Sequence, residues 1–365
     1  MELILTGGAF LIGLILVLIS IPPIINIARD KNLFEPFDKR KVHTKTVPAF
    51  GGVAIFIGFT LSSIIATDGL SFDALKYIVA SVIMMFFIGL KDDLLIISAQ
   101  KKLVVQIFAA VILITLGNVR ITNLQGILGG GEIGYFTSFI ISLVAMVAII
   151  NAFNLIDGID GLASALAILA AASFGTWFHL TGHIQFAILS YALVGSLTGF
   201  FMYNVFGNKN KLIMGDSGAL IIGLVISALV VKFNEFNILK DTNLVIKSAP
   251  SVSFAIIVIP LVDVIRVMII RILNNRSPFS PDKKHIHHRL LKLVPTSHIK
   301  VTLIILAANI SIIVLALLLN STQLNVNIQL ILVILCGILY SIIPSVILKF
   351  KLQKQLKSEK AVSQL

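Results

Sequence analysis

The sequence predicts an all-α polytopic integral membrane protein with about eleven transmembrane helices. Of its 365 residues, 57% are hydrophobic and only 13% are charged, whereas soluble domains carry about 25% charged residues. The apolar residues come in segments of about 20 residues, the length that a helix needs to cross a bilayer. Runs such as 141–150 do not alternate between apolar and polar residues, as the strands of a membrane β-barrel would. Lipid is therefore the expected solvent for most of the chain.

Short polar breaks separate the apolar segments into individual predicted spans. These spans cover residues 3–28, 48–67, 74–90, 103–118, 135–152, 161–180, 184–205, 217–232, 250–272, 300–319 and 328–349. We expect one transmembrane domain at 1–349, followed by a basic tail at 350–365. The N-terminus lacks the basic region of a secretory signal, so the first span is expected to be a permanent helix. The single cysteine, Cys336, excludes a disulfide framework and a cysteine-based zinc site.

The distribution of basic residues predicts the orientation. Most of the 29 Lys and Arg residues lie in the breaks 29–47, 91–102, 206–215 and 271–300 and in the tail. The alternate breaks carry only Lys76, Arg120, Lys232, Lys240 and Lys247. By the positive-inside rule the basic set is cytoplasmic, which places the N-terminus outside and the C-terminus in the cytoplasm. Topology thus accounts for the net charge of +12, and no nucleic-acid partner is expected.

Carboxylates gather at the span ends of the same predicted cytoplasmic face. Asp92 and Asp93 end the third span, and Asp157, Asp160 and Asp216 lie at two other junctions. Carboxylates are costly at such depths, so their placement is informative. Two adjacent carboxylates repel each other and can attract a divalent cation, although a solvated helix end would also explain the Asp92–Asp93 pair.

A second group of polar residues recurs every third position. Asn151, Asn154, Asp157 and Asp160 would form one polar row if the turn is helical. Their carboxylate and amide groups suit Mg²⁺ and hydrogen bonding to a uridine-type base. The glycines after the two aspartates would let a ligand approach the backbone. The alternative is a polar contact between helices, which two acids in the row make less favourable.

Two further acids have a structural and a functional interpretation. Asp216 opens the eighth span in the segment 214–218, where free N–H groups at a helix N-terminus favour anions. It could instead be only an N-cap. Asp263 and Arg266 are three residues apart inside the ninth span. An internal salt bridge is the favoured interpretation of that pair, and a share in a site is the alternative.

The longest basic break, 271–300, concentrates cations and imidazoles. It contains Arg271 and three histidines, His285, His287 and His288. Zinc binding is disfavoured because the adjacent His287 and His288 would point in different directions on a helix. Phosphate binding by Arg, Lys and His fits this composition better.

Together these features predict phosphoryl transfer at one membrane face. The face offers acids and amides for Mg²⁺, cations for phosphates, and direct access to lipid, so a nucleotide-activated soluble substrate and a lipid phosphate can meet there. Catalysis of this kind consists mainly of positioning and charge neutralisation. The competing class is a membrane transporter with an ion site on the cytoplasmic face, because intramembrane charges often mark ion paths. A purely structural scaffold would leave the Asn–Asp row unexplained.

The motifs also resemble those of a known family. They are Pro48 with Gly51-Gly52, Lys91-Asp92-Asp93, the segment 151–161, Gly215-Asp216-Ser217-Gly218, and the segment 277–289 with its His-Ile-His-His sequence. In this order they resemble the polyprenyl-phosphate N-acetylhexosamine-1-phosphate transferases, glycosyltransferase family 4. The resemblance runs from about residue 29 to 292 and is closest to the WecA and TagO branch, with MraY more distant. The His-Ile-His-His form argues against a muramyl-pentapeptide substrate.

The resemblance implies a role for each candidate residue. Asp92, Asp93 and Asp216 would be catalytic, with Asp216 and Asn154 as Mg²⁺ ligands. Asp92 or Asp93 would deprotonate or orient the lipid phosphate or help to hold the metal, which the resemblance leaves open. Substrate binding would fall to Lys45, Lys102, Asn151, Asp157, Asp160, Arg271, His285, His287 and His288.

The implied reaction transfers HexNAc-1-phosphate from a UDP-sugar to undecaprenyl phosphate, giving polyprenyl-diphospho-HexNAc and UMP. Residues 1–349 would then be a single catalytic domain in the bacterial inner membrane, with its site facing the cytoplasm. UDP-GlcNAc is the default donor, and GalNAc or a 6-deoxy HexNAc are alternatives. The resemblance also implies Mg²⁺ with Mn²⁺ as the alternative cation, membrane lipid as surroundings, and a homodimer.

Overall fold

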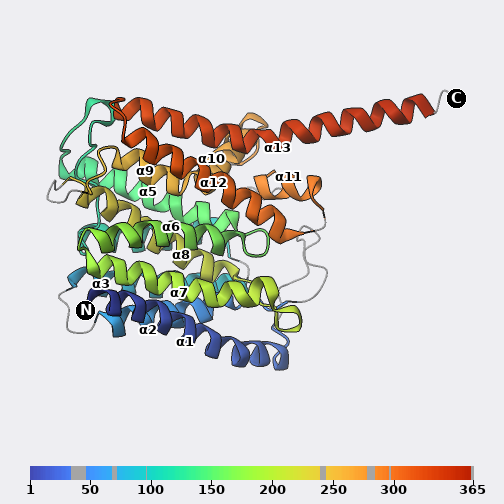
Figure 1. The fold of residues 1–365 in the computed structure, drawn as a ribbon. Coiled ribbons are helices and arrows are strands. Elements are labelled where there is room, and N and C mark those ends of the chain that lie inside the picture. Colours follow the sequence, from blue (N-terminus) through green and yellow to red (C-terminus); the bar gives the residue numbers. More distant parts are fainter. Residues whose placement is uncertain are drawn as a thin grey trace.

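A computed structural model describes residues 1–33, 47–67, 72–95, 97–238, 244–277, 284–295 and 297–362 of the chain. Within these ranges the secondary structure is helical, apart from one isolated β-bridge between Asn123 and Glu132. The helices lie side by side in one bundle, and the two ends of the chain leave it on opposite sides (Figure 1). The predicted all-α class is therefore confirmed.

Eight helices in the described part of the chain are long and apolar enough to cross a membrane. They are α1 (Glu2–Asp30), α3 (Asp73–Leu94), α5 (Tyr135–Ile156), α6 (Leu162–Leu180), α7 (Ile184–Phe206), α8 (Gly215–Phe236), α12 (His298–Asn320) and α13 (Val326–Val362). The shorter helices are α2 (Gly51–Ala66), α4 (Ala99–Thr115), α9 (Ala249–Ile256), α10 (Val258–Leu273) and α11 (Ile286–Leu293), with 3₁₀ turns η1 (Ile127–Gly129) and η2 (Asn208–Asn210).

Each of the eleven predicted spans coincides with a helix or a helix pair. The helices α2 and α4, with 16 and 17 residues, are the shortest of the helices on single predicted spans, and the pair α9 and α10 replaces the predicted span 250–272. The count of eleven membrane crossings and the orientation of the termini stay predictions. The backbone has no break at residue 350, because α13 continues as a helix to Val362. The boundary between the domain and the tail at 350 stays a prediction.

The predicted span 250–272 corresponds to a bent pair of helices. The helices α9 and α10 meet at Ile257 with a bend of 76°. Pro260 lies in the first turn of α10, where its missing N–H is tolerated. Asn309 of α12, which is fully buried, donates to the Ile256 carbonyl at 3.1 Å and accepts from the Ile259 N–H at 3.4 Å. A neighbouring helix thus satisfies backbone groups at the break, as a membrane interior requires.

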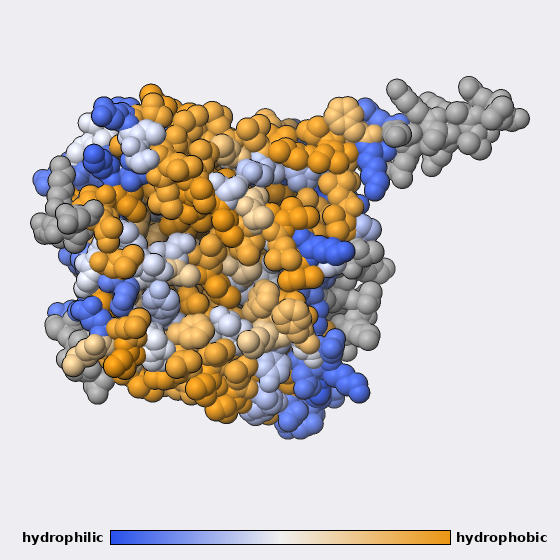
Figure 2. Space-filling model, in the orientation of Figure 1, coloured by the Kyte–Doolittle hydropathy of each residue, from blue (hydrophilic) through white to orange (hydrophobic). Residues whose placement is uncertain are grey.

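The apolar surface supports a lipid environment. Figure 2 shows apolar residues over most of the visible face, with hydrophilic residues gathered toward the two ends of the bundle. The helix α8 is central, because 83% of its apolar window is buried, against 22% for α13. Close packing against α8 needs glycine: a Cβ on Gly223 would come within 2.6 Å of the Ile150 Cα in α5, and one on Gly89 within 2.3 Å of the Ser217 Cα. The first residues of α8 are therefore held tightly against α3.

Candidate active site

The end of α3 caps the beginning of α8. Asp93 accepts hydrogen bonds from the Asp216 N–H at 2.7 Å, from the Ser217 N–H at 3.2 Å and from the Ser217 hydroxyl at 2.6 Å. These N–H groups have no partner within their own helix, so a carboxylate from α3 supplies the cap. Asp216 is therefore not the cap of its own helix. The Asp93 carboxylate holds the first turn of α8 in position, and the Asp216 side chain can therefore contact other groups.

The turn before α8 is held by the segment that contains Pro48. The Ile213 N–H donates to the Pro48 carbonyl at 2.9 Å, and the Gly51 N–H donates back to the Ile213 carbonyl at 2.9 Å. Gly215 has a positive φ of 75°, and a Cβ there would meet the Ala49 carbonyl at 2.6 Å and the Asp93 carboxylate at 2.7 Å. Glycine is required at this position by both its backbone conformation and the lack of space. The Pro–Gly-Gly motif thus holds the turn that leads into Asp216.

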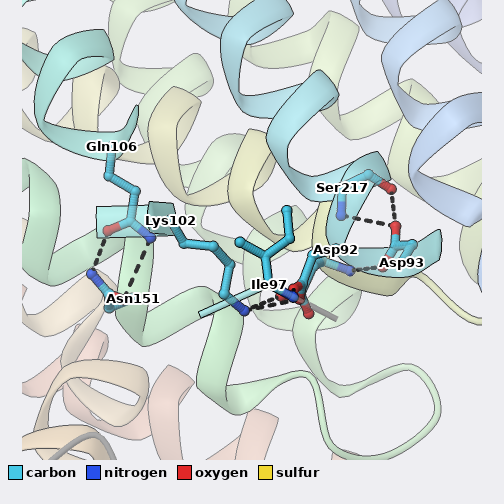
Figure 3. Close-up of polar contacts among 8 residues, drawn as sticks. Asp92, Asp93, Ile97, Lys102, Gln106, Asn151 and Ser217 are labelled. Carbon is cyan, nitrogen blue, oxygen red and sulfur yellow. Dashed lines mark hydrogen bonds and ion pairs between the residues drawn. The ribbon is translucent and has the colours of Figure 1, made fainter. Parts of the chain in front are cut away.

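Asp92 and Asp216 converge on one lysine. The Lys102 ammonium lies 3.0 Å from an Asp92 oxygen and 2.6 Å from an Asp216 oxygen, and Asp92 also accepts from the Ile97 N–H at 2.6 Å. Figure 3 shows Lys102 reaching the Asp92 carboxylate, while Asp93 faces Ser217 instead. Asn154 of α5 is hydrogen-bonded to Asp216. Of the two adjacent aspartates, only Asp92 shares this lysine with Asp216.

The donor set around Lys102 fits a hard divalent cation. The described ranges contain no group of three or more His, Cys, Asp or Glu side chains placed to hold a metal ion. Magnesium, however, is usually held by one or two carboxylates, with water and substrate phosphate oxygens completing its coordination. A cationic ammonium between two carboxylates marks a point where the protein stabilises positive charge. Asp216, Asp92 and the amide oxygen of Asn154 are the candidate ligands there.

A largely apolar cavity of about 520 Å³ adjoins this centre. Its walls come from one face each of α4, α5 and α10, and most of them are aliphatic side chains. The polar lining residues all lie toward the beginning of α4 or toward the ends of α5 and α10; they are Lys102, Gln106, Asn151, Asn154 and Arg271. Gln106 accepts from the Asn151 amide at 2.7 Å (Figure 3). The cavity thus combines apolar walls with a polar, cationic end.

The predicted polar row is split by the end of a helix. Asn151 and Asn154 lie in α5, but the helix ends at Ile156 and Asp157 is its C-cap. The Asp160 carboxylate accepts from Lys211 at 2.5 Å and from the His298 ring at 2.6 Å. The four residues therefore do not form one helical row, because α5 ends at Ile156 and the chain turns into α6 at Gly161, whose φ is 76°.

The histidine segment packs on the end of α10 and on the turn after α5. Asp263 accepts from the His285 ring and from Arg266, which confirms the predicted salt bridge of Asp263 with Arg266. His287 is 1% exposed, and neither ring nitrogen has a hydrogen-bond partner in the described ranges. Burial, chiefly, lowers the pKa of His287 well below its usual range. A Cβ on Gly158 would come within 2.1 Å of the His287 ring, so the turn after Asp157 and the histidine segment are in direct contact.

The predicted lysine Lys45 and the segment 278–283 lie outside the described residues. Sequence reasoning also missed several polar partners at the site. Gln106 is an amide inside a predicted span, a signal that could have identified it. Asn204 accepts from the Gly161 N–H at 2.6 Å and, like Lys211 and His298, belongs to no recognised motif. These partners become visible only when distant segments are brought together.

Known proteins match this chain over most of its length. Residues 75–234 match the model of glycosyl transferase family 4. The chain is 33% identical to the undecaprenyl-phosphate α-N-acetylglucosaminyl 1-phosphate transferase of Haemophilus influenzae, over 78% of each chain. Proteins of the same name from Pasteurella multocida and Escherichia coli O157:H7 are 34% and 30% identical, over 82% of each chain and over 77% of this chain and 75% of the relative. The chain belongs to glycosyl transferase family 4.

Family membership confirms the resemblance drawn from the motifs, and the geometry sorts the motif residues of this family 4 member into two groups. Asp92, Lys102, Asn154 and Asp216 converge beside the cavity, with Arg271 also in its lining. His285, His287 and the turn at Asp157–Asp160 form a neighbouring polar group on the same side of the bundle, with His288 beside the His287 ring at 4.3 Å between ring centroids. The individual roles of these residues stay predictions.

Proposed function

We propose that this chain transfers HexNAc-1-phosphate, with UDP-GlcNAc as first choice of donor, to undecaprenyl phosphate, yielding polyprenyl-diphospho-HexNAc and UMP. The observation that carries the proposal is the carboxylate–lysine centre at the polar end of an apolar cavity. The curated relatives, whose name gives undecaprenyl phosphate and N-acetylglucosaminyl 1-phosphate, support the substrates. The site would face the cytoplasm of the bacterial inner membrane.

The geometry supports direct displacement at phosphorus. An oxygen of the lipid phosphate attacks the sugar-bearing phosphorus of the UDP-sugar, and the bond from that phosphorus to the bridging oxygen breaks. The released UMP carries the bridging oxygen and its electron pair. No covalent enzyme intermediate is needed, since the ionised lipid phosphate is itself a nucleophile. The chain has mainly to position both phosphates and to offset their charge.

The residues of the centre divide this work. Lys102 leaves its carboxylate contacts and binds the acceptor phosphate. Arg271 supplies a second cation in the cavity lining. Asp92 orients the acceptor head group, and Asp93 holds the first turn of α8 in place. Asp216 and Asn154 would hold Mg²⁺ (or Mn²⁺), which when bound supplies charge neutralisation at the diphosphate. The aliphatic walls accept the first isoprene units of the lipid. The cavity volume of about 520 Å³ is within the usual range of ligand sites, roughly 300–1,000 Å³.

A donor panel tests the proposal. Protein in detergent is given undecaprenyl phosphate, Mg²⁺ and UDP-GlcNAc, UDP-GalNAc or a UDP-6-deoxy-HexNAc, and both UMP and the lipid product are measured. We expect UDP-GlcNAc to be preferred, EDTA to abolish UMP release, and Mg²⁺ to restore it. A transporter would release no UMP with any donor, and that result would overturn the proposal. Chemical cross-linking of the same preparation tests whether the chain is a homodimer.

The metal site has its own variant test. Asp216→Asn should lower UMP release at least about a thousandfold, because it removes a carboxylate at which charge is neutralised. The matched control is Asp73→Asn, since Asp73 is an exposed carboxylate in the first turn of α3, paired only loosely with Lys76 at 3.9 Å. It should keep wild-type activity. Full activity of Asp216→Asn would remove Asp216 from the metal site.

A further inference from the structure

A fully buried carboxylate lies next to the active site without lining it. Asp263 is 0% exposed and belongs to α10, whose cavity-facing side chains include Val264, Met268 and Arg271 but not Asp263. One carboxylate oxygen accepts from the Arg266 guanidinium at 2.7 Å and from the Ile286 N–H at 2.9 Å. The other lies 2.9 Å from the Nδ1 of His285. Burying a charge is costly unless it is fully hydrogen-bonded, and here it is.

The imidazole of His285 connects this carboxylate to the cavity. His285 is 4% exposed, and its other nitrogen, Nε2, lies 3.5 Å from the Arg271 guanidinium. Arginine can only donate, so Nε2 must accept and must carry no proton. The proton then resides on Nδ1, where it donates to Asp263. Only the neutral Nδ1–H tautomer satisfies both contacts.

We propose that Asp263 is a positioning residue that acts through His285 to aim Arg271 into the cavity at the phosphate of the lipid acceptor. This inference rests on the proposed function for the identity of the acceptor. The carboxylate fixes the tautomer of His285, and the bare Nε2 then holds one guanidinium nitrogen of Arg271. Asp263 touches no substrate itself. The same carboxylate caps the first turn of α11 through the Ile286 N–H, so the histidine segment and the cavity share one anchor on α10.

The variant Asp263→Asn has a specific expected defect. The oxygen that already accepts from Ile286 and Arg266 would remain an oxygen, so the amide NH₂ would face His285 Nδ1. The imidazole must then accept at Nδ1 and carry its proton on Nε2, which places an N–H against the Arg271 guanidinium. The fold keeps its shape while Arg271 loses its contact with His285.

The tautomer can be observed without any activity assay. Protein labelled with ¹⁵N-histidine is compared with the same protein carrying His285→Asn, which identifies the His285 signals by their loss. We expect a protonated Nδ1 and a bare Nε2 in the wild type, and the reverse in Asp263→Asn. An imidazolium in the wild type, or the same tautomer in both proteins, would overturn the proposal even if no donor were turned over.

Kinetics then test whether Asp263 acts through Arg271. Asp263→Asn should lower kcat/KM for undecaprenyl phosphate about tenfold or more, and Arg271→Gln should lower it at least as much. In the double variant, Asp263→Asn should add less than about twofold, because residues acting in one chain of contacts are not additive. Multiplied losses would mean that Asp263 acts independently of Arg271 and would refute the inference.

A second variant covers the case in which Asp263→Asn does not fold. His285→Asn keeps an amide N–H near the Asp263 carboxylate but has no atom that reaches Arg271. It should show the same loss in kcat/KM for the acceptor, with a melting temperature close to that of the wild type. Wild-type acceptor kinetics in this variant would show that the carboxylate serves only to anchor α11. Absence of UMP release from the wild type would instead count against the proposed function. The tautomer measurement would then still test whether Asp263 acts through His285.

Discussion

Lys102 and Lys232 are two half-buried lysines at opposite ends of the bundle, and their surroundings differ in kind. Lys102 lies between the carboxylates of Asp92 and Asp216 and lines the cavity. Lys232, near the end of α8, donates to the Asn118 carbonyl at 2.8 Å and lies over the rings of Phe186 and Phe236, at 5.9 and 5.8 Å from their centroids. The second lysine is stabilised by a fixed backbone dipole and by aromatic faces. The first is held by charges that a cationic or anionic ligand can compete for.

The two ends of α8 show the same contrast. At its first turn, Asp93 accepts three hydrogen bonds, one from Asp216 and two from Ser217. At its last turn, Glu235 accepts from the N–H and hydroxyl of Thr122, at 2.7 and 2.8 Å. Both carboxylates fasten the helix to another segment, but only the first lies beside further acids and a cavity. Carboxylates at helix ends are thus common to both regions, and convergence distinguishes the candidate site.

The largest expected difference concerns the two lysines. Lys102→Met should lower UMP release about a hundredfold, since it removes a preorganised cation from the reacting phosphates. Lys232→Met should change the rate by less than about threefold, because its contacts are to backbone and rings at the other end. Steady-state rates in detergent with saturating donor measure both. Equal losses would erase the functional distinction between the two ends.

The carboxylates that fasten the two ends of α8, Asp93 of α3 and Glu235 of α8 itself, should contribute differently to stability. Asp93→Ala removes a cap with three hydrogen bonds and should destabilise the protein by about 2 kcal/mol. Glu235→Ala removes two bonds and should cost about 1 kcal/mol. Melting curves in detergent give both values. A larger effect at Glu235 than at Asp93 would contradict the view that the α3–α8 junction is the more tightly built of the two.

The smallest expected effect is the pH dependence of stability from the buried histidines. Burial lowers the pKa of both His287 and His183. Below about pH 6.5 the unfolded chain binds protons that the folded imidazoles resist, so folding stability falls as the pH falls, by at most about 1.4 kcal/mol per pH unit for each group. We expect the melting temperature of His287→Gln to fall less steeply between pH 7 and 5 than that of the wild type. His183, stacked on Phe236 at 3.7 Å between ring centroids, is the control at the other end, and His183→Gln should change the slope less.

The sequence alone determined the fold class, the approximate spans and the candidate residues for the chemistry. These are local properties: a helix that crosses lipid needs a continuous apolar segment, and polar residues are costly enough there to be recognised where they occur. The family followed from motif order. Even so, the sequence did not predict the bend of 76° between α9 and α10, because Asn309, which binds the free backbone groups there, lies some 50 residues away.

Only the tertiary structure decided which contacts each motif residue makes. Asp92 and Asp93 are adjacent and chemically identical, yet one meets Lys102 and the other caps α8. That difference depends on contacts between residues 123 positions apart. Asp263 likewise is a salt-bridge partner by sequence and a link from His285 to Arg271 only in the folded chain. Hydrogen-bond partners depend on direction and distance within a few tenths of an ångström, and packing of distant helices sets both.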